Sequence, residues 1–184
     1  MHKIITSVLV LLLFISTKNN AQSIFTGHVG LNYSSVSSKN SINPDGILGL
    51  NVGFAYKMYL DDLGWAVTPG IDFSQEGFAD RRLNYLNLPV SLGFDFTNNF
   101  SLSAGLQYSQ LLGGPTDVKQ VIYSSNFAFL VTFEFFPSEK FVTGLRFANG
   151  IKNIIKEPDV IVIENASTYS IQFYVGMVLF NKSK

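Results

Sequence analysis

The residues of this sequence that are best suited to chemistry are a few charged side chains in a chain where charged residues make up only 14%. Six of them fall at alternate positions of extended apolar segments, so that they share one face. They are Lys57, Asp72, Glu76, Asp95, Glu134 and Arg146. Charges of both signs inside one enclosed space must pair or remain hydrated. They would therefore form either an ion path or acid–base site, or a polar network that fills an interior.

Motifs that would mark an enzyme or a cofactor site are missing from the sequence. There is no Gly-x-Ser-x-Gly, His-Glu-x-x-His or phosphate-binding glycine loop. The absence of cysteine excludes disulfides, thiolate metal sites, cysteine nucleophiles and a lipoprotein anchor. A formal net charge of zero gives no indication of a nucleic-acid partner. We expect no catalytic residue, no metal and no cofactor.

The elements that must position the charges are strands, because large apolar residues alternate with small or polar ones from residue 23 onward. In residues 46–60, for example, Leu50, Val52 and Phe54 alternate with Asn51 and Gly53. In residues 126–135, Leu130 is an exception, because it is a large apolar residue at a position where the alternation predicts a small or polar one. The eight segments with this pattern are residues 24–34, 46–60, 65–76, 85–96, 100–110, 126–135, 141–149 and 169–180.

The segments and their connections together predict a transmembrane barrel. Each segment has about the 9–11 residues that a tilted strand needs to cross a bilayer. Long polar connections are expected at residues 35–45, 75–84, 112–125 and 150–167, and short turns at 61–64, 97–99 and 137–140. Long loops outside and short turns inside are typical of outer-membrane barrels. We therefore predict an all-β, eight-stranded, antiparallel up-and-down transmembrane β-barrel, with its N-terminus in the periplasm.

Residue size indicates which face of the strands points outward. The main alternative is a soluble, lipocalin-like barrel with an apolar interior. Here the polar faces are rich in Gly, Ala and Ser, which suits a narrow interior, whereas the other faces are bulky. Aromatic residues such as Trp65, Phe96, Phe100 and Tyr169 lie toward strand ends, as in the aromatic girdles of membrane barrels. The pattern favours a lipid-facing exterior.

The N-terminus reads as a targeting segment. Lys3 precedes an apolar run from Ile4 to Ile15, which is shorter than the roughly 20 residues of a membrane-spanning helix. We expect residues 1–21 to be a signal peptide cleaved after Ala21 and residues 22–184 to be the barrel, located in the outer membrane. A short N-terminal anchor helix is the alternative.

The interior of an eight-stranded barrel is only wide enough for side chains to fill it, so a diffusion pore is not expected. Arg146 and Lys57 should meet Glu134, Asp72 or Asp95 there. Barrel enzymes that modify outer-leaflet lipids need a His with a Ser and a carboxylate near the outer surface. The barrel segment has only His28, placed toward the periplasmic end of the first strand. We expect His28 to be a packed interior residue.

The connection after the seventh segment is the loop with the most apolar character. It is a candidate partner-binding hairpin, although its residues would equally well only extend the seventh and eighth strands. Its residues are Ile151, Ile154, Ile155, Val160, Ile161, Val162 and Ile163.

Residues 83–90, Leu-Asn-Tyr-Leu-Asn-Leu-Pro-Val, resemble the Tyr-Leu-x-(Ile/Leu)-Pro strand of the PorT-like outer-membrane β-barrel proteins of Bacteroidetes. Asn87 stands where members of that family often carry Glu. The Ala21-Gln22 junction resembles signal peptides of the same phylum. The resemblance implies an eight-stranded outer-membrane barrel and little about activity, although one member of the family assists a protein secretion and gliding system.

Taken together, the sequence predicts a non-enzymatic integral outer-membrane protein with a structural role or a loop-mediated binding or assembly role. Its partners would be outer-membrane lipid and a protein bound through the extracellular loops, and we expect a monomer. The alternatives are an enzyme that modifies outer-leaflet lipids and a soluble lipocalin-like carrier.

Overall fold

The structure is a computed structural model that describes residues 22–37, 45–78, 81–116, 122–151 and 167–182. These residues form eight strands connected in sequence order. The strands are β1 (Ser23–Ser37), β2 (Ile47–Tyr59), β3 (Trp65–Phe78), β4 (Arg81–Asp95), β5 (Phe100–Gly113), β6 (Ser125–Ser138), β7 (Phe141–Gly150) and β8 (Ser167–Lys182). Within these ranges no helix has the length and apolar character needed to cross a membrane.

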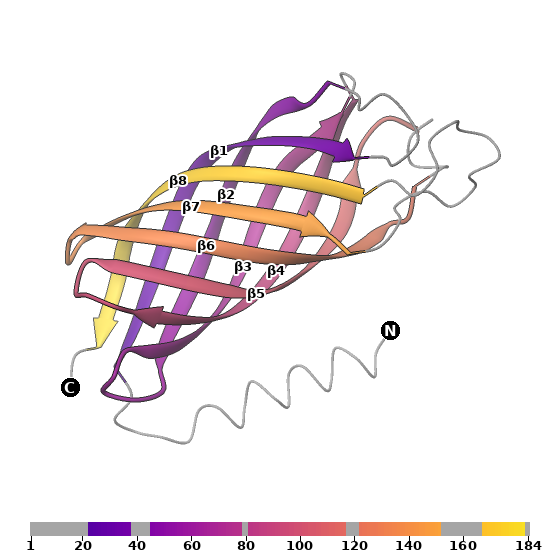
Figure 1. Ribbon diagram of the computed structural model, residues 1–184. Helices are drawn as coiled ribbons and strands as arrows, with labels where there is room; N and C mark the ends of the chain where they lie inside the picture. The colour runs from indigo at the N-terminus through magenta and orange to yellow at the C-terminus, as the bar shows by residue number, and fades with distance from the viewer. Residues whose placement is uncertain (1–21, 38–44, 79–80, 117–121, 152–166, 183–184) are drawn as a thin grey trace.

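The strands close into a barrel in which each strand pairs antiparallel with its neighbours in the chain, and β8 pairs with β1 (Figure 1). Val29 of β1, for example, lies opposite Val52 of β2 on one side and Val175 of β8 on the other. Closure leaves no strand edge unpaired. The predicted eight-stranded antiparallel fold is confirmed.

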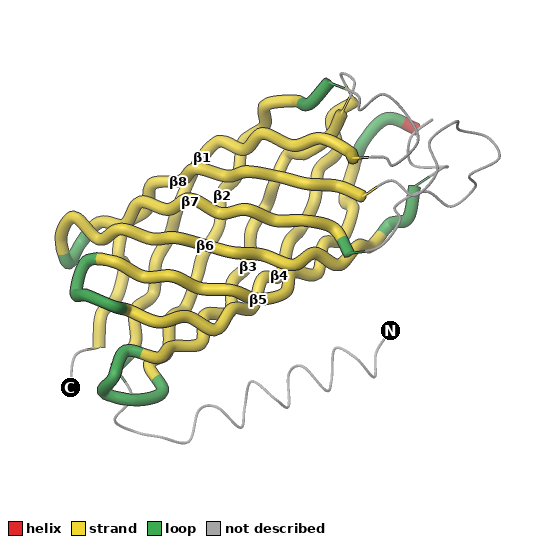
Figure 2. The backbone as a smooth tube through the Cα atoms, viewed as in Figure 1, coloured by secondary structure: helices red, strands yellow, loops and turns green. Residues whose placement is uncertain are grey.

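Loops and turns lie at the two ends of the barrel (Figure 2). We call the end with the β2–β3, β4–β5 and β6–β7 connections the turn end, and the opposite end the loop end. At the turn end, Asp61 Oδ1 accepts hydrogen bonds from the backbone N–H groups of Leu63 at 3.1 Å and Trp65 at 3.0 Å. Gly64 between them has a φ of 103°, which favours glycine. This turn confirms the predicted connection at residues 61–64.

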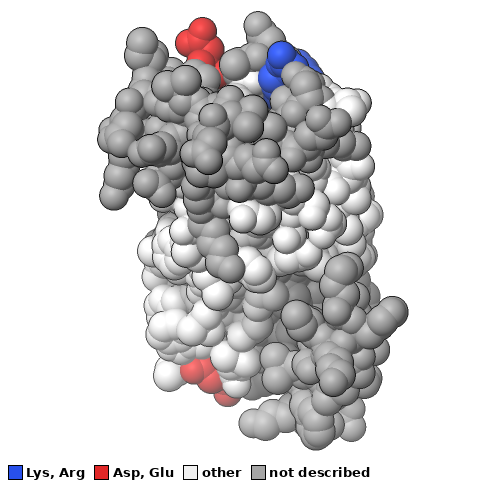
Figure 3. All heavy atoms as spheres, turned by 90° about the vertical axis from the view of Figure 1, so that its right-hand side faces the viewer, with Lys and Arg blue, Asp and Glu red and all other residues white. Residues whose placement is uncertain are grey.

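The alternation of residues sorts the two faces of the barrel as predicted. Leu50, Val52 and Phe54 are exposed on the outer face of β2, whereas Asn51 and Gly53 face inward. On the face drawn in Figure 3, the described acidic and basic residues lie only near the two ends, with an uncharged band between them. The exception in the sixth segment is confirmed as well, because Leu130 is buried in the interior with Ala128 and Ala148.

The strands are longer than expected, from 10 residues in β7 to 16 in β8. The predicted long loop at residues 75–84 is wrong. The β3–β4 ladder continues through the pairs Glu76–Leu83 and Phe78–Arg81, so that only residues 79–80 connect the two strands. Polar side chains indicated a loop at this place, but a sheet that projects beyond an apolar belt accepts polar residues on both faces.

Two prolines interrupt the ladders on one side of the barrel. The β2–β3 ladder breaks between the pairs Ala55–Gly70 and Met58–Val67, and the β3–β4 ladder breaks between Pro69–Val90 and Asp72–Asn87. Proline lacks the backbone N–H that a ladder needs. The ring of Pro89 packs over Gly70, where an added Cβ would lie 3.0 Å from the proline Cγ. The strands around Pro69 and Pro89 are therefore paired less regularly than an unbroken ladder.

Candidate functional site: the charge network inside the barrel

Asp72 on β3 is the central acceptor of the barrel interior. Arg146 Nη1 on β7 donates a hydrogen bond to Asp72 Oδ2 at 2.6 Å, and His28 Nε2 on β1 lies 3.0 Å from Asp72 Oδ1. Arg146 also donates through Nε to the hydroxyl of Thr132 at 3.4 Å. All of these side chains are buried. β1 and β7 thus converge on a carboxylate of β3, because each of the three strands presents an ionisable side chain at an inward position.

Two glycines make room for this cluster. A Cβ on Gly53 of β2 would overlap the Asp72 carboxylate, and a Cβ on Gly144 of β7 would overlap the ring of Tyr174. Small residues on the inner face therefore serve a packing purpose in a narrow barrel, because they allow large side chains of neighbouring strands to lie flat across them.

A second cluster lies nearer the turn end, around Lys57 on β2. Its Nζ is 2.7 Å from Asp95 Oδ1 on β4 and donates to the hydroxyl of Ser101 at 3.1 Å. Glu134 Oε2 on β6 is also within ion-pair distance, at 3.8 Å. The hydroxyl of Tyr59 donates to the second oxygen of Asp95 at 2.5 Å. One ammonium group is thereby shared by two carboxylates.

Tyr174 on β8 connects the two clusters. Its hydroxyl donates to Glu134 Oε1 at 2.8 Å, while its ring lies 5.5 Å from the Arg146 guanidinium carbon and 4.7 Å from the His28 ring. A guanidinium over an aromatic face is a favourable cation–π contact. A continuous network of polar and aromatic contacts therefore extends from His28 to Tyr59. We refer to it as the charge network.

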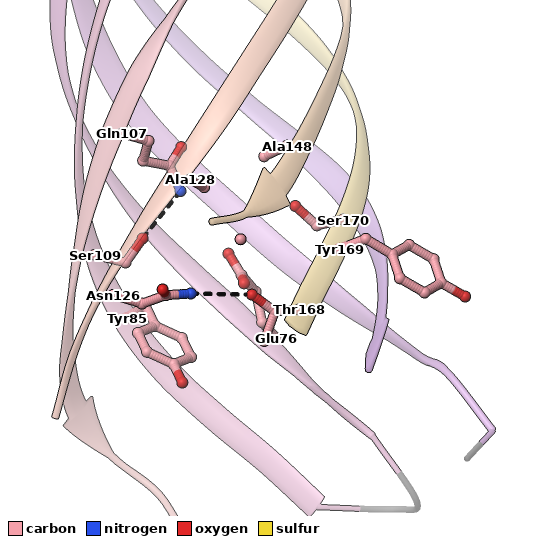
Figure 4. Close-up of a pocket in the computed structure, with 11 residues that line it drawn as sticks. Glu76, Tyr85, Gln107, Ser109, Asn126, Ala128, Ala148, Thr168, Tyr169 and Ser170 are labelled. Atoms are coloured by element: carbon pink, nitrogen blue, oxygen red, sulfur yellow. Dashed lines mark hydrogen bonds between the residues drawn. The ribbon is translucent and has the colours of Figure 1, made fainter. Parts of the chain in front are cut away.

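Glu76 on β3 lies outside the charge network. It accepts a hydrogen bond from Asn87 Nδ2 at 3.3 Å and lines a small cavity near the loop end (Figure 4). The cavity has a volume of about 10 Å³, which is about the space of one water molecule.

The structure places all six charged residues that the sequence singled out in the interior, and it joins all but Glu76 in the charge network. Sequence reasoning missed the contact of His28 with Asp72 and the roles of Tyr59 and Tyr174. Both tyrosines fall at inward-facing positions that alternate with outward apolar residues, and this pattern could have predicted that they lie in the interior. Of the candidate loop residues, Ile151 is exposed. Ile154, Ile155, Val160, Ile161, Val162 and Ile163 lie outside the described residues.

The network's chemistry is that of paired charges in a filled space. Among the described residues, no group of three or more His, Cys, Asp or Glu side chains is arranged to hold a metal ion. Each ammonium or guanidinium is held by a carboxylate, which is the condition under which charges are tolerated away from water.

Comparison with known proteins gives the fold and not the family. No protein-family model matches the chain. No curated protein matches it either. Solved structures do match. The attachment invasion locus protein Ail of Yersinia pestis is 14% identical with a TM-score of 0.52, and the match covers 86% of this chain and 98% of that chain.

Two further solved structures have the same fold. Neisserial surface protein A is 10% identical with a TM-score of 0.52, over 84% of this chain and 97% of that chain. The outer membrane enzyme PagL is 11% identical with a TM-score of 0.55, over 83% of this chain and 99% of that chain. The class is therefore the eight-stranded β-barrel of the kind found in outer membranes. Because these structures include both surface proteins and an enzyme, the fold alone does not assign an activity.

Proposed function

We propose that this chain is a non-enzymatic integral outer-membrane protein whose barrel anchors its loops at the cell surface. The observation that carries the proposal is the outer face of the barrel. Large apolar side chains are exposed on every strand, such as Leu50, Leu106 and Phe173, each with more than half of its surface accessible. A continuous apolar surface of this extent needs lipid rather than water around it.

The interior supports a structural role for the barrel. The charge network and the packed tyrosines occupy the space through which a solute would pass. Buried charges that pair with one another also give a filled interior a defined arrangement. We therefore propose that the charge network stabilises the barrel and does not form a conducting pathway.

A test of the membrane assignment is the fractionation of cells that produce the full chain. We expect the protein in the outer-membrane fraction, extracted only by detergent, with a gel mobility that changes on heating because the folded barrel resists unfolding by detergent. Periplasmic β-barrel proteins produced in the same cells serve as the control for leakage. Recovery in the soluble periplasmic fraction would favour the lipocalin-like carrier instead.

The second proposal is that His28 has no catalytic role. Its Nε2 faces Asp72 in the middle of the barrel, and the residue is only 7% exposed. A base that acts on lipid in the outer leaflet has to reach the lipid surface. We expect lipid A from cells that produce His28→Ala to have the same mass spectrum as lipid A from cells that produce the unchanged protein. A modification that depends on the unchanged chain and disappears with His28→Ala would establish an enzyme.

We propose that the remaining function resides in the loops, as a binding or assembly role for a monomeric barrel with a protein partner. Ail has been solved in complex with the heparin analogue sucrose octasulfate, which is an example of ligand binding by a protein with this fold. In the present chain, Ile151 at the end of β7 is exposed and begins the apolar connection that we propose as the binding segment.

We also propose membership of the PorT-like barrels of Bacteroidetes. The support comes from residues 83–90, where Leu83 and every second residue after it, Tyr85, Asn87 and Pro89, face the interior, whereas Leu86 and Leu88 face outward. The inward proline packs over Gly70. The motif is thus a packing motif of one strand, which is why it indicates a family of barrels and not an activity.

A further inference from the structure

The pairing of β1 with β8 closes the barrel and differs in its chain connection from every other pairing of the described strands. The other ladders join strands that follow one another in the sequence, whereas this one joins the first strand to the last (Figure 1). The entropy cost of bringing two segments together rises with the length of chain between them. The β1–β8 seam is therefore the ladder that the chain connection supports least, and it gains most from side-chain contacts that cross it.

The inner side of the seam is built from large side chains that face glycines. Gly30 of β1 lies opposite Tyr174 of β8, and His28 of β1 lies opposite Gly176 of β8. A Cβ on Gly30 would lie 2.7 Å from Tyr174 Cβ, and a Cβ on Gly176 would lie 3.0 Å from His28 Cβ. The two glycines allow the rings of Tyr174 and His28 to meet across the seam, with 4.7 Å between their centroids.

Further contacts connect these two rings through β3 and β7. His28 Nε2 lies 3.0 Å from Asp72 Oδ1 of β3, and Asp72 Oδ2 accepts a hydrogen bond from Arg146 Nη1 of β7 at 2.6 Å. The guanidinium carbon of Arg146 lies 5.5 Å from the ring centroid of Tyr174. The contacts thus form a closed circuit of four side chains on β1, β3, β7 and β8. We refer to these side chains, His28, Asp72, Arg146 and Tyr174, as the four-residue circuit.

The ion pair between Asp72 and Arg146 requires a closed barrel. If the seam opened and the sheet flattened, β4, β5 and β6 would separate β3 from β7, which at a strand spacing of about 4.8 Å places them about 19 Å apart. An aspartate and an arginine side chain together cannot span that distance. Both residues are buried in the closed barrel, and opening would leave each charge without its partner.

We propose that the four-residue circuit is an interior latch that keeps the β1–β8 seam closed. The proposal rests on the structural role proposed above for the charge network and names the seam as the place where that role is exerted. Removing the guanidinium of Arg146 releases Asp72 from its ion pair and Tyr174 from its cation–π contact. The β1–β8 ladder should then open more often, whereas ladders remote from the circuit keep their pairing.

The test is backbone amide hydrogen exchange of the full barrel folded in detergent micelles, followed residue by residue by NMR. Exchange of this kind reports the local opening of a ladder. In Arg146→Met we expect exchange across the β1–β8 ladder to accelerate about tenfold more than exchange across the β4–β5 ladder. The amides around the pair Val29–Val175 report on the seam, and those around the pair Val90–Leu106 report on the reference ladder.

The matched control is Lys57→Met, because Lys57 is a buried cation of the same network, 5% exposed against 6% for Arg146. Its polar partners are Asp95 of β4, Ser101 of β5 and Glu134 of β6. Loss of this ammonium group breaks contacts away from the seam. Exchange in Lys57→Met should therefore rise no more across β1–β8 than across β4–β5.

An equal acceleration along both ladders in Arg146→Met would overturn the latch and leave the structural role of the charge network standing. No acceleration at either ladder would overturn both. If Arg146→Met does not fold, Arg146→Lys keeps the positive charge but loses the planar guanidinium, and it should show a smaller acceleration that is again confined to the seam. An acceleration spread over both ladders in that variant would equally refute the latch.

Discussion

Replacing Arg146 with methionine is expected to destabilise the folded barrel by about 3–5 kcal/mol, the cost of leaving a buried charge without its partner. Arg146 is 6% exposed and Asp72 is 2% exposed. With the guanidinium gone, the Asp72 carboxylate retains only the contact with His28 at 3.0 Å. The cation–π contact with Tyr174 is lost at the same time. Urea-induced unfolding in lipid vesicles measures the change.

Two control variants separate charge pairing from loss of packing. In the double variant Arg146→Met with Asp72→Asn, both charges are removed together, and we expect most of the lost stability to return. Arg82→Met removes an exposed arginine at the β3–β4 hairpin and should change stability by no more than about 0.5 kcal/mol. If Arg146→Met unfolds at the same urea concentration as the unchanged protein, the charge network does not stabilise the barrel.

The barrel could be predicted from the sequence because side chains of a strand alternate between its two faces, and this alternation is visible before any contact is known. A strand such as β2 places Lys57 inward and Phe54 outward whatever its neighbours are. The same argument located the inner charged residues. It also marked Leu130 as the exception to the alternation in its segment, and the structure buries that residue in the interior because alternation holds through a strand unless a bulge intervenes.

Sequence reasoning could not choose the ion-pair partners, because pairing inside a closed barrel depends on register and on which strands face each other across the interior. Asp72 and Arg146 are 74 positions apart on strands that are not neighbours. The tyrosine contacts were missed for the same reason. Tyr174 reaches Glu134 across the intervening β7, above Gly144, and that contact follows only from the three-dimensional arrangement.

Polarity alone misled the prediction at the loop end. Asn84 was expected in a loop, whereas the structure places it in a paired strand, opposite Gln75. A strand has to be apolar only where it meets lipid. The polar cavity beside Glu76 is a consequence of this extension, because the additional ladder pairs enclose a space that a loop would have left open.

Replacing Leu106 with arginine is expected to destabilise the barrel in lipid vesicles by about 2–4 kcal/mol, the cost of a charged side chain at the middle of the bilayer. Leu106 lies near the middle of β5, opposite Val90 and Phe129, and is 56% exposed on the outer face. The substitution breaks no polar contact and leaves the interior intact. Its effect therefore reports on the medium that surrounds the barrel.

The matched control is Leu63→Arg, since Leu63 is 75% exposed in the β2–β3 turn outside the apolar belt. We expect that variant to change stability by no more than about 0.5 kcal/mol. Urea titration of both variants in the same vesicles gives the comparison. In a soluble barrel an arginine at position 106 would be solvated, and the two variants would behave alike. A difference between them can arise only if the outer face of β5 lies in hydrocarbon, which links the alternation seen in the sequence to residence in the membrane.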